Sequence, residues 1–424
     1  MASRRASSWA LLVGLWVWAA PAAGRPVYLI GLDGASWNVM GPLMEQGRLP
    51  NLSRLAAMGS SGTLLSSHPM LSPALWTTIA TGVPREEHGI TDFTVGRRRL
   101  TSKDRRAPAI WEILSASSRT VCLVGYMKTW PAEPVNGVMV SDLLFNKGAR
   151  PQLTFPADAL RGLDPLQAWD EDSPQSVRRL RRFIPFDWDP DYELAEDTAA
   201  YRRGLLVDRR LSWVYMRDES YVRLAERLLA RRKPDFFAIH LWGIDFVSHG
   251  FWKYMEPAAP GVAESERGDF SAVIPRYYEY VDELVGRLLA LAGDDADVLV
   301  VSDHGFEAWT APQDVPESTS ILSGNHAIEG VLLAAGPDIQ RGATVKGASQ
   351  LDLAPTMLYL LDAPIARTLK GRVLDKLLAV EPARRRPLRL VKSYPARSLI
   401  APQEPGEPLG GKEFEMLRAS GYLK

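Results

Sequence analysis

The sequence predicts an α/β fold built around a largely parallel β-sheet. Three short apolar runs carry this prediction, at residues 26–34, 234–242 and 296–305. Their length and unbroken apolar character are typical of strands that are buried on both faces of a parallel sheet. Segments with helical periodicity lie between such runs, and this alternation is typical of α/β proteins.

The first quarter of the chain contains predicted strands and helices in turn. After the strand at 26–34, helical periodicity extends over 36–58 and is interrupted by GRLPN, and GTLLSS at 62–67 reads as a strand. The next segment, SPALWTTIATG, predicts a helix with Ser72 as N-cap, Pro73 in the first turn and Gly82 at its end. A further helix at 107–117 and a strand at 120–126 are expected to follow.

The composition changes between residues 127 and 231, where Pro, Trp, Asp and Arg are dense. We interpret 127–231 as an inserted cap subdomain. A predicted helix at 219–232 leads from it back to the core. Beyond it we expect an amphipathic helix at 273–293, a strand at 330–336 and a helix at 351–361. The expected α/β core therefore comprises 25–126 and 232–380, and residues 381–424 are expected to form a C-terminal extension packed on this core.

The N-terminus has the features of a secretory signal peptide over residues 1–24. Arg4 and Arg5 precede an apolar run at 9–20, and small residues follow. We therefore expect an exported protein, periplasmic or secreted, with an uncleaved N-terminal anchor as the alternative. The mature chain is expected to contain no transmembrane segment, because no later run is apolar enough to span a bilayer.

Charge and cysteine content exclude some classes of protein. Lys and Arg together number 50, as do Asp and Glu, so the formal net charge is zero and the basic footprint of an obligate nucleic-acid-binding protein is missing. The only cysteine is Cys122, which rules out an intramolecular disulfide and is expected to be a buried strand residue.

Six side chains suited to binding metal lie at or just after predicted strand ends, or in the glycine-bounded loop GNHAIEG. Functional groups gather beyond the carboxyl ends of strands in parallel sheets. Carboxylates and imidazoles are ligands of Zn²⁺, and six are too many for one tetrahedral ion but suit two. The six are Asp33, Asp245, His249, Asp303, His304 and His326.

The order of these residues is more informative than any one of them. A single Asp at a strand end is usually a turn residue, and a single His is usually packed. Asp245 and His249 are four residues apart, which would place both on one face of a helical turn. Structural roles are expected for the remaining histidines, His68, His88 and His240.

Four segments give the chain a resemblance to a known family. They run from LIGLDG through EEHGI, over PDFFAIHLWGIDFVSH, over VLVVSDHGF and over GNHAIEG. In these segments the chain resembles the type I phosphodiesterase/nucleotide pyrophosphatase branch of the alkaline phosphatase superfamily. The resemblance implies an alkaline-phosphatase-like three-layer α/β/α sandwich with a largely parallel central sheet and an inserted cap.

The resemblance also implies a phosphoester small-molecule substrate and two divalent metal ions, expected to be Zn²⁺. One ion would be held by Asp33, Ser72, Asp303 and His304, and the other by Asp245, His249 and His326. Ser72 would be the catalytic nucleophile and would form a phosphoserine intermediate during in-line phosphoryl transfer. A hydroxyl at the start of a helix suits this role, because the helix dipole and the unpaired backbone N–H groups favour an anionic phosphoryl group.

Two features leave the reaction open. Nucleotide pyrophosphatases of this branch carry an Asn three residues after HGI, where this chain has Phe93, and Pro73 after Ser72 has no N–H to donate. The alternatives are a phosphomonoesterase of the same superfamily and a non-catalytic metal-binding protein on this scaffold. A sulfatase is disfavoured, because LSPALW lacks the Cys/Ser-x-Pro-x-Arg context. A cofactor-independent phosphoglycerate mutase shares the metal core, but an export signal does not fit a glycolytic role.

Overall fold

The computed structural model describes residues 24–146, 150–163, 174–189, 191–194, 198–255, 257, 259–308, 323–379 and 386–395. The expected signal peptide, apart from Gly24, and most of the expected C-terminal extension lie outside these residues, so both stay predictions. The same applies to parts of the expected insertion.

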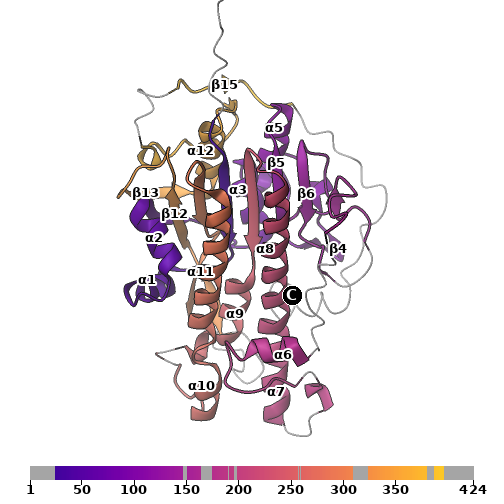
Figure 1. Cartoon of the computed structure of the whole chain (residues 1–424), viewed down its shortest axis with the longest axis vertical. Coiled ribbons are helices and arrows are strands. Elements are labelled where there is room, and N and C mark those ends of the chain that lie inside the picture. The colour runs from indigo at the N-terminus through magenta and orange to yellow at the C-terminus, as the bar shows by residue number, and fades with distance from the viewer. Residues whose placement is uncertain are drawn as a thin grey trace, which may run out of the picture.

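A single large sheet forms the centre of the molecule (Figure 1). Its middle strands β9, β1, β8, β5 and β6 are all parallel, which confirms the predicted sheet. The strand expected at 330–336 is β12, which runs antiparallel to both β9 and β2, and β7 runs antiparallel to β6. Among the described residues the strand order is β13 (Thr344–Ser349), β2 (Ser60–Leu65), β12 (Glu329–Ala335), β9 (Asp297–Val301), β1 (Val27–Leu32), β8 (Phe236–Leu241), β5 (Val121–Tyr126), β6 (Gly137–Ser141) and β7 (Thr154–Phe155).

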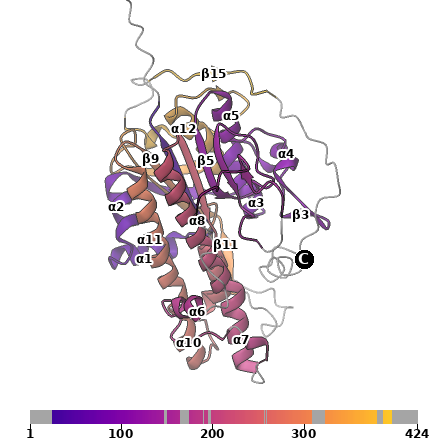
Figure 2. The ribbon, with the colours of Figure 1, turned by 45° about the vertical axis from the view of Figure 1, so that its right-hand side comes forward.

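Helices cover both faces of the sheet, which gives the three layers (Figure 2). On one face lie α2 (Pro50–Met58), α8 (Trp213–Arg231) and α11 (Val273–Ala292). On the other lie α3 (Ser72–Thr81), α5 (Ile110–Ala116) and α12 (Leu353–Leu360). Every residue of β1, β8 and β9 is buried between these layers, which explains why these strands are apolar apart from Asp297 and His240. The remaining helices are α1 (Trp37–Glu45), α4 (Arg85–His88), α6 (Pro174–Leu180), α7 (Thr198–Val207), α9 (Gly243–Phe251) and α10 (Glu264–Phe270).

The range expected to form an insertion contributes to the main sheet as well. Strands β6 and β7 extend the sheet beyond β5, and α8 packs against β5 and β8. Helices α6 and α7 lie beyond the lower end of the sheet in Figure 1. The boundaries of a separate cap therefore stay a prediction, while part of this range belongs to the central layer. Cys122 is buried in β5.

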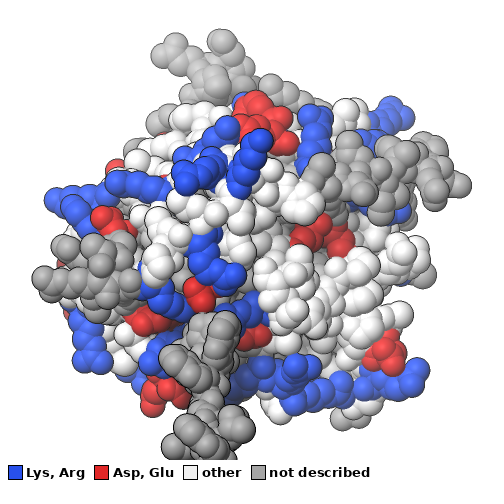
Figure 3. All heavy atoms as spheres, turned by 90° about the horizontal axis from the view of Figure 1, so that it is seen from above, with Lys and Arg blue, Asp and Glu red and all other residues white. Residues whose placement is uncertain are grey.

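The surface at one end of the molecule carries charges of both signs (Figure 3). Figure 3 shows Lys and Arg interspersed with Asp, Glu and uncharged residues at the end where β15 (Leu390–Val391) and α5 lie. No helix in the described part of the chain combines the length and the apolar composition that crossing a membrane requires.

His88 has the structural role that the sequence predicts. It is fully buried at the end of α4, and its Nδ1 accepts a hydrogen bond from the Ile90 N–H at 3.2 Å. The Thr78 hydroxyl already donates to the Ala74 carbonyl, so it accepts from His88 Nε2, at 3.1 Å. Both ring nitrogens are thus occupied in the neutral imidazole, which ties α4 to the middle of α3.

His88 should make the fold sensitive to acid. Burial and the nearby Arg105 guanidinium lower the pKa of His88 from 6.5 to about 3. Below pH 6.5 the unfolded chain takes up a proton that the folded chain refuses, so stability falls as the pH drops towards 3. Between about pH 7.5 and 5.5, the wild type should lose roughly 1 kcal/mol more unfolding free energy than His88→Asn, measured by urea denaturation. Equal losses in both proteins would contradict this role.

Candidate functional site: two ligand groups beside a serine

Ser72 begins helix α3 at the carboxyl edge of the sheet. It is the first helical residue and not the N-cap that the sequence predicted; the N-cap is Leu71. The reason is that Pro73 fits the first turn without an N–H to cap, and the Ser72 hydroxyl instead donates to Asp33 Oδ1 at 3.2 Å. Gly82 ends the helix in the left-handed conformation, as expected.

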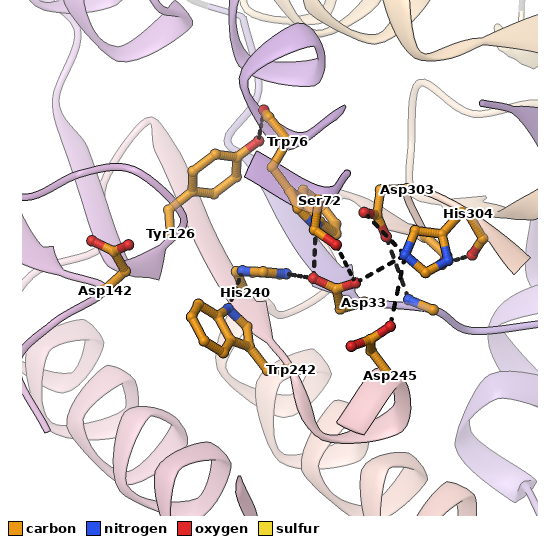
Figure 4. Close-up of polar contacts among 12 residues, drawn as sticks. Asp33, Ser72, Trp76, Tyr126, Asp142, His240, Trp242, Asp245, Asp303 and His304 are labelled. Atoms are coloured by element: carbon orange, nitrogen blue, oxygen red, sulfur yellow. Dashed lines mark hydrogen bonds and ion pairs between the residues drawn. The ribbon is translucent and has the colours of Figure 1, made fainter. Parts of the chain in front are cut away.

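The other hydroxyls of α3 are committed to the helix backbone. Thr77 Oγ1 donates to the Pro73 carbonyl at 2.7 Å, and Thr78 Oγ1 donates to the Ala74 carbonyl at 3.0 Å. The N–H groups of Ala74 and Leu75 both bond to the Leu71 carbonyl. Ser72 is therefore the hydroxyl of this helix that is directed at the carboxylate cluster (Figure 4).

Asp33 follows β1 and is the most densely bonded member of the site. Its Oδ2 is 3.0 Å from the Trp76 indole nitrogen, which donates to it, and 2.9 Å from His240 Nε2. Trp76 can approach because Gly31 has no side chain; a Cβ there would lie 2.5 Å from the indole ring. With Oδ2 occupied by these donors, Oδ1 faces Ser72 and also lies 3.4 Å from His304 Nε2.

The first ligand group joins the ends of two neighbouring parallel strands. Asp303 and His304 follow β9, and with Asp33 they form a buried group whose potential ligand atoms lie within 4.8 Å of one another. The Gly34 N–H donates to Asp303 Oδ1 at 3.4 Å, and His304 Nδ1 donates to the Gly305 carbonyl at 2.9 Å. Within the described part of the chain, Asp303 Oδ2 and His304 Nε2 have no hydrogen-bond partner.

The second ligand group consists of Asp245, His249 and His326, and its ligand atoms also lie within 4.8 Å of one another. Helix α9 begins directly after β8 and places Asp245 and His249 on one face, with Asp245 Oδ1 and His249 Nε2 3.4 Å apart. His326 Nε2 is 3.2 Å from the same carboxylate oxygen. Asp245 Oδ1 lies 3.8 Å from His304 Nε2, so the two groups adjoin.

His326 lies on a strand and not in the loop that the sequence predicted. Strand β11 (Gly324–Ala327) pairs antiparallel with β10 (Gly305–Ala308), and His326 stands opposite Phe306. Four residues are too few to display a strand periodicity, and the pairing partner β10 lies outside the loop segment from which the prediction was made. Because β10 directly follows His304, this pairing stacks the two imidazoles with 3.7 Å between their ring centroids.

The donor geometry of these residues fits divalent cations. Each of the three candidate ligand histidines donates its Nδ1–H to a backbone carbonyl. The acceptor is Gly305 for His304, Gly324 for His249 and Met70 for His326. The tautomers are thereby set with the Nε2 lone pairs facing inward, as in metal-ligating histidines. The Nε2 atoms of His249 and His326 lie 2.9 Å apart, and two lone pairs at that distance repel unless a cation or proton lies between them. Imidazole nitrogen and carboxylate oxygen are the ligands Zn²⁺ takes.

The electrostatics of the first group also call for positive charge. Burial raises the pKa of Asp303 well above its usual value, and the Asp33 carboxylate raises it further. Burial would also raise the pKa of Asp33, but the hydrogen bond from His240 and, when its Nε2 is protonated, the His304 imidazole hold it at about 2. Burial alone would lower the pKa of His304, yet Asp303 and Asp33 raise it to about 10. A proton on His304 is one way to balance these carboxylates, and a divalent cation is the other.

Sequence reasoning missed three residues that surround Asp33. Trp76 and His240 both bond to its carboxylate, and the Trp242 indole N–H donates to His240 Nδ1 at 2.7 Å. His240 was expected to be merely packed. A usable signal was its place as the polar residue of an otherwise apolar strand, in register with Gly31 on the neighbouring β1. Nothing in the sequence pointed to the two tryptophans.

Phe93, which replaces the expected Asn, is a packing residue in the described structure. It is buried, its ring lies under the Lys128 ammonium at 5.3 Å, and its carbonyl accepts from Lys128 Nζ at 3.1 Å. The position therefore supplies no polar side chain for a phosphate oxygen.

Solved structures share this architecture. Human ectonucleotide pyrophosphatase/phosphodiesterase 5 superposes with a TM-score of 0.51 at 13% identity, covering 84% of this chain and 100% of the human chain. A 2-O GAG sulfatase superposes with a TM-score of 0.52 at 14% identity, covering 85% of this chain and 76% of the sulfatase. At these identities the likeness shows the shared fold and leaves the reaction open.

Sequence comparisons add a short match and a long one. A 2,3-bisphosphoglycerate-independent phosphoglycerate mutase of Shewanella denitrificans is 35% identical over 107 residues, which cover 25% of this chain and 19% of the mutase. This chain thus matches about a fifth of that relative's length. The family model of type I phosphodiesterase/nucleotide pyrophosphatase matches residues 27–349. That match begins with β1, ends with β13 and includes Ser72 and both ligand groups, and it shows that the chain belongs to the type I phosphodiesterase/nucleotide pyrophosphatase family of the alkaline phosphatase superfamily.

Proposed function

We propose that this protein is an exported phosphoester hydrolase of the phosphodiesterase/nucleotide pyrophosphatase type, which uses Ser72 as its nucleophile and two divalent cations, Zn²⁺ in our assignment. The observation that carries the proposal is the Ser72 hydroxyl, 3.2 Å from Asp33 Oδ1, beside two adjoining groups of three buried ligands. A non-catalytic metal-binding protein would have no use for a hydroxyl directed at that cluster.

Asp33, Asp303 and His304, with the Ser72 oxygen, would hold one cation, and Asp245, His249 and His326 would hold the other. When bound, such cations supply Lewis-acid stabilisation of the charge that develops on the attacking and leaving oxygens. The ten-residue helix α3 directs its N-terminus at the same place, which favours an anionic phosphoryl group. Pro73 has no N–H, and the N–H groups of Ala74 and Leu75 are bonded to the Leu71 carbonyl, so the helix would contribute mainly through its dipole.

The proposed reaction proceeds in two displacements. Asp33 stays ionised at neutral pH and accepts from the serine hydroxyl, which orients Oγ. Oγ loses its proton and forms a bond to phosphorus as the bond from phosphorus to the ester oxygen breaks, and the leaving oxygen takes up a proton and departs as the alcohol. In the second step the oxygen of a water molecule forms a bond to phosphorus as the bond from phosphorus to Oγ breaks. One water proton returns to Oγ, which restores the hydroxyl and releases the phosphate product.

Replacing the nucleophile tests the reaction. We expect Ser72→Ala to lower kcat/KM by about 10³-fold or more, because no other hydroxyl of α3 is directed at the cluster. The assay is turnover of bis-(p-nitrophenyl) phosphate beside p-nitrophenyl phosphate by zinc-loaded protein. Thr77→Val is the matched control, since its hydroxyl is committed to the Pro73 carbonyl. Unchanged activity in Ser72→Ala contradicts the serine mechanism, and a strong preference for the monoester would reassign the protein as a phosphomonoesterase.

Removing one histidine tests the cation sites. We expect the wild type to bind two Zn²⁺ ions per chain and His326→Ala to bind one, because the second group keeps only two of its ligands. Elemental mass spectrometry after dialysis against a weak chelator measures the stoichiometry. His68→Ala, whose side chain is exposed, should retain both ions. Two tightly bound ions in His326→Ala would show that His326 is not a ligand.

Export is tested on the purified native protein. We expect its N-terminus to lie near Gly24 after expression in a host with a secretory pathway, because the Arg pair and apolar run precede small residues there. N-terminal sequencing and fractionation provide the measurement. An intact N-terminus in the membrane fraction would indicate an uncleaved anchor.

A further inference from the structure

The dipeptide Trp242–Gly243 lies between His240, which bonds to the first ligand group, and α9, which carries two residues of the second. His240, which bonds to Asp33, lies near the end of β8, and α9, which carries Asp245 and His249, begins at Gly243. Whatever fixes this dipeptide therefore fixes Asp245 and His249 of the second group, and also His240, the hydrogen-bond partner of Asp33 in the first.

Asp218 of the neighbouring helix α8 accepts hydrogen bonds from both backbone N–H groups of this dipeptide. Its Oδ1 accepts from the Trp242 N–H at 3.0 Å, and its Oδ2 accepts from the Gly243 N–H at 3.0 Å and from the Tyr277 hydroxyl at 3.1 Å. Helix α9 has no side-chain cap of its own, so this fully buried carboxylate takes the place of an N-cap. Gly243 is required for the arrangement, because a Cβ there would lie 1.9 Å from the Tyr277 hydroxyl.

Arg217 holds the Trp242 side chain. Its guanidinium carbon lies 3.9 Å from the centre of the Trp242 ring, and its Nη1 lies 3.6 Å from Asp218 Oδ1. The side chain is buried, and none of its three nitrogens has a hydrogen-bond partner among the described residues. Its contribution is thus the charge that balances Asp218 and the flat surface that stacks on the indole.

Trp242 in turn decides how His240 meets Asp33. An indole N–H can only donate, so His240 Nδ1 must be the acceptor of the 2.7 Å bond between them. The proton of the neutral ring is then on Nε2, which donates to Asp33 Oδ2 at 2.9 Å. This leaves Oδ1 of Asp33 for Ser72 and for the first ligand group.

We propose that Arg217, Asp218 and Trp242 form a positioning device that sets both cation-binding groups from helix α8: the carboxylate fixes the start of α9, and the indole fixes His240 and through it Asp33. These are positioning residues, since they act through His240 and α9. The inference rests on the proposed function, because it concerns the cation sites assigned there. It also gives the expected insertion, which contains α8, a direct part in the site.

Trp242→Phe tests the indole alone, since it keeps an aromatic ring for Arg217 and removes the N–H. We expect its affinity for one of the two Zn²⁺ ions to fall by about tenfold, because His240 loses the bond that directs its Nε2–H at the candidate ligand Asp33, and hydrogen-bond partners that orient ligands contribute about this much. The measurement is competition titration with a chromophoric chelator, repeated in the His326→Ala background, where only the Asp33 group still binds. Trp111→Phe is the matched control, because it removes an indole N–H that donates to Glu133, at 3.4 Å.

The outcomes separate the inference from the function on which it rests. Wild-type protein with two Zn²⁺ ions and Trp242→Phe with unchanged affinities would overturn the positioning device and leave the hydrolase proposal standing. An equal loss in Trp111→Phe would overturn it too, by attributing the effect to packing. Wild-type protein that binds no Zn²⁺ would overturn both. If Trp242→Phe does not fold, the same Zn²⁺ titration is made on Asp218→Asn. A weaker affinity for Zn²⁺ in that variant supports the inference, and wild-type affinity for both ions overturns it.

Discussion

The structure depends on one electrostatic constraint: three carboxylates, Asp33, Asp245 and Asp303, are buried within reach of one another at the carboxyl edge of the sheet. Charges of one sign are costly in an interior of low dielectric constant unless donors or cations compensate them. The neighbouring side chains are arranged as such compensation. Indole, imidazole, hydroxyl and backbone N–H groups all converge on the cluster. The free-energy cost of burying three carboxylates together falls at the place where a cation-binding site would need them.

The compensation is directional. Donors from Trp76 and His240 meet one oxygen of Asp33, so its other oxygen is presented to Ser72. Backbone carbonyls accept hydrogen bonds from the Nδ1–H groups of the three candidate ligand histidines, so each Nε2 faces inward. Groups fixed in this way need little rearrangement when charge develops, which is the general basis of electrostatic preorganisation. The rigid surroundings follow from burial, since α3 is buried along its whole length.

The sheet provides the framework for this geometry. Parallel pairing of β1 with β8 and β9 brings the carboxyl ends of these three strands together. More than 200 residues of chain separate β1 from the other two. The antiparallel pair β10 and β11 then returns the chain over the same edge and delivers His326. Helix α8 completes the enclosure from the other side and reaches the start of α9 through Asp218. Elements from both the expected core and the expected insertion thus build one site.

The sequence by itself determined the apolar strands, the helix that starts at Ser72 and the polar residues at strand ends, because burial on both faces and helix periodicity are properties of contiguous residues. That was enough to predict the α/β fold and the six candidate ligands. It was wrong about the cap of α3 and about a loop at His326, and it overlooked Trp76, His240 and Trp242. Only the tertiary structure decided these points, because each depends on a partner outside the segment concerned: Asp33 for Ser72, β10 for β11, and Asp218 for the peptide at Trp242. Local pattern records which residues a chain buries, whereas the direction in which a buried polar group points is set by the neighbour it meets.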